Sequence, residues 1–144
     1  MGSFTKMKHY PLGRRKLLRI ALAYTSATTA GLTHDITVLS IPAKTLIHEV
    51  IADTTTQWAG TAGTLFLRVG TTTGDSDLVA EHDVESATIV QGGIVSPNGV
   101  LPSWSAATTI SARIRSSSGN VGNGTTTLLS AGATTLYITL EELA

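Results

Sequence analysis

The sequence contains no cysteine, which excludes disulfide bonds, thiolate nucleophiles and metal sites held by cysteine. Charge is also scarce. Only 14% of the residues are Asp, Glu, Lys or Arg, whereas an average soluble domain has roughly 25%. A surface with so few charges leads us to expect that another molecule covers much of it.

Long apolar runs are missing as well, and none approaches the roughly 20 residues that cross a bilayer. The segment GRRKLLRIALAY, residues 13–24, begins like a twin-arginine export signal. Arg19 interrupts its apolar stretch, however, and a strand with Leu18, Ile20 and Leu22 on its inward face explains the pattern better. Export with removal of a leader remains the alternative.

Motifs for catalysis, metal binding and phosphate binding are absent. The chain has no G-x-S-x-G and no G-x-x-x-x-G-K motif, and its four histidines lie in separate segments without metal-ligand spacing. We therefore predict that the protein is not an enzyme and uses no cofactor. The acidic segment 74–85 offers a weak Ca²⁺ candidate in Asp75 and Asp77, but it lacks EF-hand spacing, and a solvated loop is the favoured interpretation.

The two tryptophans, Trp58 and Trp104, are each flanked by small residues, and we expect both in loops. Exposed tryptophans in loops can stack on sugars, so a secreted carbohydrate-binding β-sandwich is one alternative function. Filling the end of a sandwich is the favoured role for both side chains.

Threonine and glycine are abundant, with 24 and 14 residues, and turn signals separate short β-rich runs. This pattern predicts an all-β fold, an antiparallel eight-stranded β-sandwich that is jelly-roll-like. The expected strands are residues 16–24, 34–41, 45–53, 64–70, 78–80, 87–90, 108–116 and 134–142.

Alternation within these runs predicts which side chains face the core. Leu136, Ile138 and Leu140 share one face of the last run. In residues 45–53 both faces are partly apolar, with Val50 on one and Ile47 on the other. We therefore expect that strand to be central in its sheet or to lie at a subunit contact.

Charge divides the chain into a basic N-terminal arm and an acidic body. Residues 1–19 hold six basic and no acidic residues, whereas residues 20–144 hold four basic and ten acidic residues. We predict an extended arm at 1–15 and one sandwich domain at 16–144, with the arm binding an acidic protein surface. The expected contact residues are Phe4, Lys6, Lys8, Tyr10, Leu12, Arg14, Arg15, Lys16 and Arg19.

Two stretches resemble small structural proteins of tailed bacteriophages. They are TLIHEVIADTTTQWAGTAGTLFLRVGTTTGDSDLVA at 45–80 and the pair ATTISARIRSSSGN and AGATTLYITLEE near the C-terminus. The resemblance implies a trimeric virion β-sandwich of the capsid decoration or cement type. Such a protein would lie on the outer capsid surface, with the major capsid protein and copies of itself as partners and without nucleic acid or membrane. A tail or head–tail joint protein is the alternative within this class.

Overall fold

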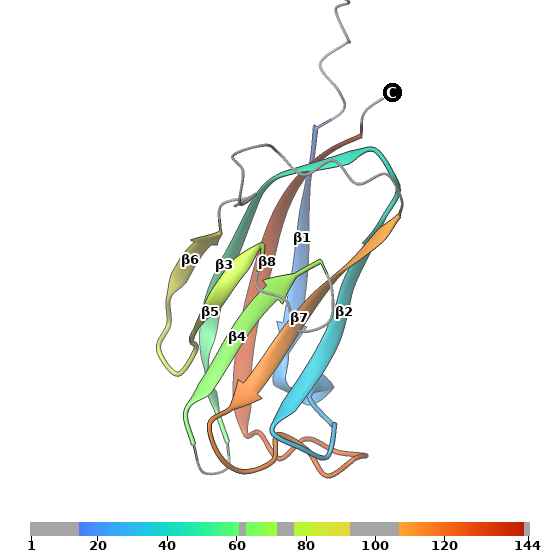
Figure 1. Cartoon of the computed structure of the whole chain (residues 1–144). Helices are drawn as coiled ribbons and strands as arrows, with labels where there is room; N and C mark the ends of the chain where they lie inside the picture. Colours follow the sequence, from blue (N-terminus) through green and yellow to red (C-terminus); the bar gives the residue numbers. More distant parts are fainter. Residues whose placement is uncertain (1–14, 61–62, 72–76, 93–106, 143–144) are drawn as a thin grey trace, which may run out of the picture.

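The computed structural model describes residues 15–60, 63–71, 77–92 and 107–142, which form two four-stranded antiparallel sheets packed face to face (Figure 1). The predicted all-β sandwich of eight antiparallel strands is confirmed. The elements are β1 (Arg15–Ala23), the 3-10 turn η1 (Tyr24–Ser26), β2 (Thr33–Ile41), β3 (Thr45–Ala59), β4 (Leu65–Gly70), β5 (Val79–Asp83), β6 (Ile89–Gly92), β7 (Thr108–Ser116) and β8 (Ala131–Glu142). Within the described ranges, no helix has the length and apolar character needed to cross a membrane.

The strand order gives the sandwich its topology. The first sheet, which we call sheet I, has the order β1-β8-β3-β6, and the second, sheet II, has the order β2-β7-β4-β5. The antiparallel pairs therefore include β1 with β8, β2 with β7, β3 with β6, and β4 with β5. A long double ribbon of strands rolled up in this way is the eight-stranded jelly roll.

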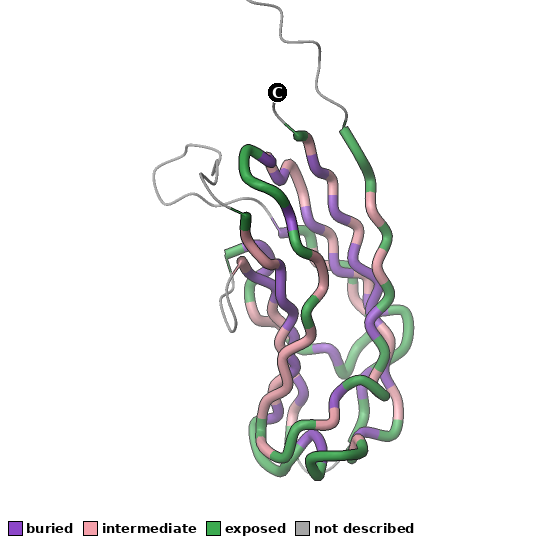
Figure 2. Tube along the Cα trace, turned by 90° about the vertical axis from the view of Figure 1, so that its right-hand side faces the viewer, coloured by how far each residue is buried: buried purple, intermediate pink, exposed green. Residues whose placement is uncertain are grey.

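The core follows from the period-two alternation of the strands. Leu136, Ile138 and Leu140 of β8 are buried as predicted, and the intervening Tyr137 and Thr139 are only partly covered. Figure 2 shows this alternation along the strands as buried positions next to intermediate or exposed ones. The apolar faces of the two sheets thus meet between the layers, which leaves each sheet one outer face for other contacts.

One prediction of facing is wrong in β3. Ile47 is completely buried together with Val50 and Ala52, although strict alternation places Ile47 on the opposite face. The register between β3 and β8 shifts between Ile47 and Glu49, which is the signature of a β-bulge. The extra residue in a bulge turns the following side chains over, so both Ile47 and Val50 reach the core. β3 lies between β8 and β6, as expected for a central strand.

Trp58 also differs from its predicted position, because it belongs to β3 and not to a loop. Its side chain is 1% exposed, and its indole Nε1 donates a hydrogen bond to Thr134 Oγ1 at 2.9 Å. Gly132, with φ of 146°, makes room for the ring, since a Cβ there would lie 2.4 Å from Trp58 Cδ2. Trp58 fills the interior, as favoured, and cannot stack on a sugar. Trp104 lies outside the described residues.

Candidate partner-binding surfaces

The described part of the predicted contact set lies on β1, at the edge of sheet I. Arg15 and Lys16 form ion pairs with the last two residues of β8. Arg15 Nε lies 3.5 Å from Glu141 Oε2, and Lys16 Nζ lies 3.7 Å from Glu142 Oε1. The two basic side chains are 62% and 55% exposed, so these pairs add little stability and leave both cations open to a partner. Phe4, Lys6, Lys8, Tyr10, Leu12 and Arg14 lie outside the described residues.

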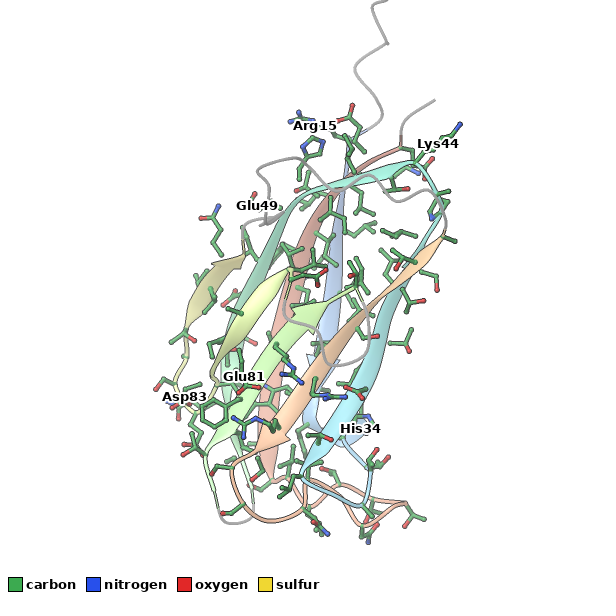
Figure 3. All side chains as sticks on the ribbon, viewed as in Figure 1. Arg15, His34, Lys44, Glu49, Glu81 and Asp83 are labelled. Atoms are coloured by element: carbon green, nitrogen blue, oxygen red, sulfur yellow. The ribbon has the colours of Figure 1, made fainter. Side chains whose placement is uncertain are left out.

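The same end of the sandwich carries a histidine beside this carboxylate. His48, in the bulged region of β3, lies with Nε2 2.6 Å from Glu141 Oε2. Arg15 and Lys44 project at this end in Figure 3, near the point where the chain leaves β8. Charged groups of both signs therefore gather where β1 begins and β8 ends.

The outer face of sheet I is broad and weakly charged. Residues directly opposite one another on paired strands share a face, so the registers place Arg19, Tyr137, Ile51 and Gln91 in one row across β1, β8, β3 and β6. We define the sheet I face as the outward residues of these strands, which are Leu17, Arg19, Ala21, Glu49, Ile51, Asp53, Ile89, Gln91, Thr135, Tyr137 and Thr139.

Exposed apolar residues mark the two edges of the sheet I face. Leu17 on β1 is 67% exposed and Ile89 on β6 is 72% exposed, and these are the two most exposed large hydrophobic side chains among the described residues. Gln91 Nε2 donates a hydrogen bond to Glu49 Oε1. Arg19 and Asp53 have no hydrogen-bond or ion-pair partner within the described ranges.

The outer face of sheet II is built differently, because its charges neutralise one another. Arg113 on β7 donates from Nε and Nη2 to the two carboxylate oxygens of Asp35 on β2, at 2.6 and 2.8 Å. Arg115, two residues on, donates to Glu81 of β5 at 2.6 and 3.1 Å. Arg68 Nη1 on β4 lies 3.8 Å from Glu81 Oε2. These side chains link all four strands of sheet II, and we call them the sheet II charge ladder.

The ladder shifts the pKa values of Glu81, Arg113 and Arg115 toward their charged forms. The hydrogen bond from Arg115 is the main reason that the pKa of Glu81 is lowered, and burial opposes this effect. Conversely, the pKa of Arg113 is raised by its hydrogen bond to Asp35, and that of Arg115 by its hydrogen bond to Glu81. The guanidinium carbon of Arg115 also lies 4.6 Å from the centroid of the Phe66 ring, in cation–π contact.

The acidic segment 74–85 contributes to this ladder and is not simply a solvated loop. Glu81 and Asp83 lie on β5, where Figure 3 labels them. Asp77 accepts hydrogen bonds from Thr71 N at 2.8 Å and Thr71 Oγ1 at 2.6 Å, which ties the residue after β4 to a residue shortly before β5. Asp75 lies outside the described residues. Among the residues that the structure does describe, no three acidic or histidine side chains gather as a metal site would require.

Sequence reasoning missed the sheet II charge ladder, although a signal for it existed. Three of the four basic residues between positions 20 and 144 lie in the two runs that become β4 and β7. Adjacent, antiparallel placement of those runs puts Arg68 opposite Arg113. Such a cluster of like charge needs acidic neighbours on both sides, which β2 and β5 supply.

Comparison with known proteins finds similarity in structure and not in sequence. No protein-family model matches the sequence, and no curated protein matches it. A chain in the capsid of Ralstonia phage GP4 superposes with a TM-score of 0.61 at 15% identity, covering 92% of this chain and 87% of that one. A chain in the capsid asymmetric unit of cyanophage Pam1 gives 0.54 at 15% identity, covering 93% and 89%. This protein therefore shares its fold, over nearly its whole length, with chains found in two phage capsids.

Proposed function

We propose that this chain is a structural protein of a bacteriophage virion and serves as a decoration or cement protein of the capsid. The proposal rests mainly on the structural match to two phage capsid chains. The match extends over nearly all of this chain and over 87% and 89% of the lengths of those two chains. The likeness is thus between whole chains of similar size. The resemblance of residues 45–80 and of the last two strands to phage decoration proteins supports the same role.

The distribution of surface chemistry supports a binding role. A weakly charged sheet I face with exposed Leu17 and Ile89 suits contact with other protein subunits. The basic N-terminal segment, residues 1–19, suits an acidic protein surface, because it holds six basic residues and no acidic one. We propose that the major capsid protein and further copies of this chain, arranged as a homotrimer, supply these surfaces on the outside of the head.

The proposed mechanism is clamping by many weak contacts. Residues 1–14 can span at most about 50 Å when extended, and we propose that they cross onto a neighbouring subunit of the capsid. Lys6, Lys8 and Arg14 would supply charged contacts there, with Phe4 and Tyr10 as apolar anchors. Repetition of the contact over a symmetric lattice raises the total affinity without any strong single site.

The location of the chain in virions tests the proposed function. In virions of the phage that encodes it, gold-labelled antibody should mark the head and not the tail. Heads that lack the protein should release DNA at a lower temperature than complete heads, measured as nuclease-sensitive DNA. Labelling at the tail or at the head–tail joint would favour a tail or joint protein instead. Absence of the protein from virions would refute the proposal.

A matched set of variants tests the clamp itself. The triple variant Lys6→Gln, Lys8→Gln and Arg14→Gln removes three positive charges from the arm, and we expect about tenfold weaker capsid occupancy as contacts across the capsid surface are lost. The control Thr25→Asp, Ser86→Asp and Thr126→Asp changes net charge equally at exposed positions outside the strands. Occupancy is measured by densitometry of purified heads. Equal loss in both variants would mean that net charge, and not the arm, governs binding.

A further inference from the structure

Two features of the sheet I face are typical of a surface that contacts another protein. The first is the pair of exposed apolar side chains, Leu17 and Ile89, which lie on the two opposite edge strands of the sheet. Between them, Ala21, Ile51 and Tyr137 extend the apolar character across β1, β3 and β8. The apolar surface is therefore a band that crosses the whole sheet.

The second feature is a pair of opposite charges that have no partner. Arg19 projects from β1 and Asp53 from β3, and neither side chain makes a hydrogen bond or ion pair with any described residue. β8 lies between their strands, and Asp53 lies two residues beyond Ile51, which shares a row with Arg19, so more than about 10 Å separates the two Cα atoms within one chain. The positive charge thus lies toward the β1 edge and the negative charge toward the β6 edge of the same face.

We propose that copies of this chain associate through the sheet I face, with the β1 side of one copy against the β3 and β6 side of the next. Arg19 then pairs with Asp53 of the neighbouring copy, and Leu17 packs toward Ile89 of that copy. The two sides of the face are complementary, so this contact can repeat around a ring of copies or be made twice across a two-fold axis. This interface gives a physical basis to the homotrimer in the proposed function and rests on that proposal for the number of copies.

Charge complementarity favours a second copy over an unrelated partner. One face carries both members of the complementary pair, and the apolar band reaches both edges at which neighbouring copies would meet. The outer face of sheet II offers no equivalent, since its arginines already have carboxylate partners in their own chain. The sheet I face is the one whose unpaired groups a copy of the same chain would satisfy.

A charge-swap experiment on the full chain tests the interface. Wild-type protein should sediment as an oligomer, and Arg19→Asp or Asp53→Arg alone should weaken association by about tenfold or more, since each places like charges together. The double variant Arg19→Asp with Asp53→Arg should restore it to within about threefold, because the pair is re-formed in reverse. Lys44→Asp and Glu85→Arg, which make the same charge changes at exposed loop positions, should leave association unchanged.

A second pair of substitutions keeps the test decisive if Asp53→Arg disturbs β3. Leu17→Ser with Ile89→Ser removes the two exposed apolar groups and should abolish oligomers while circular dichroism and the urea midpoint stay as in the wild type. A wild-type protein that is monomeric at all concentrations, or singles that the double variant does not rescue, would overturn the inference and favour a different protein as the occupant.

The two proposals fail in distinguishable ways. A chain that decorates virions but stays monomeric in solution would refute the sheet I interface and leave the virion role intact. A chain that associates through Arg19 and Asp53 but is absent from virions would refute the proposed function and leave the interface intact.

Discussion

The two outer faces of this sandwich differ in how their charged side chains are paired. On sheet II, Arg113 and Arg115 are held by carboxylates of their own chain, in hydrogen bonds as short as 2.6 Å. On sheet I, Arg19 and Asp53 have no such partner within the described ranges, and apolar side chains stand exposed beside them. A face whose charges pair within the chain can remain in contact with water. A face with unpaired charges and exposed apolar side chains is suited to contact with another subunit.

The largest expected difference between the faces concerns the arginines. Arg113→Ala leaves the half-buried Asp35 without its two hydrogen bonds, and we expect a loss of about 2 kcal/mol in the free energy of unfolding. Arg19→Ala removes no side-chain hydrogen bond or ion pair with the described residues and should change the free energy of unfolding by less than about 0.5 kcal/mol. Urea unfolding at a concentration where the protein is monomeric measures both. Equal losses in the free energy of unfolding for the two variants would contradict the difference between the two faces.

A smaller effect is expected in acid. Because the pKa of Glu81 is lowered, chiefly by the hydrogen bond from Arg115, its contribution to stability is present above the ordinary carboxyl pKa of 4.5. That contribution is lost as the pH falls through the lowered folded-state value. Urea midpoints measured from pH 6 to pH 2.5 should therefore fall more steeply for the wild type than for Glu81→Gln.

The matched variants for this prediction remove the partner instead of the acid. Arg115→Gln should flatten the acid dependence as Glu81→Gln does, since it deletes the hydrogen bond that lowers the pKa. Lys44→Gln, at an exposed lysine that forms no ion pair with the described residues, should preserve the wild-type slope. A wild-type slope in Arg115→Gln would show that the sheet II charge ladder does not govern acid stability.

The fold could be predicted from the sequence because its strands obey local rules. Alternation fixed the inward residues of β8, such as Leu136 and Ile138, and turn residues separated the eight runs. The prediction failed where tertiary structure overrides alternation. A bulge after Ile47 has no marker in the local pattern, and β3 continues through Thr54 to Trp58 because pairing with β8 extends it.

The surfaces were harder to predict because they are made by residues far apart in the chain. Asp35 and Arg113 are 78 positions apart, and Glu81 and Arg115 are 34 apart. No spacing rule joins such pairs before the strand order is known. Asp53 was equally hidden, since only the rows across sheet I place it on the same face as Arg19. The basic residues of β1 could be selected from sequence as contact candidates because their charge stands out locally, and their role in binding stays a prediction.

The smallest expected effect tests how far the sheet II charge ladder reaches. Burial lowers the pKa of His34 on β2, and the neighbouring Asp35 carboxylate opposes this by favouring the imidazolium. Its contribution to stability is present above the ordinary histidine pKa of 6.5 and is lost as the pH falls through the lowered folded-state value. Asp35→Asn should lower the pKa of His34 further, because it removes the opposing charge.

An NMR titration of the His34 imidazole measures this change in pKa. Asp53→Asn, on the other face, should leave the titration unchanged, and an equal shift in both variants would mean that the two faces are not electrostatically separate.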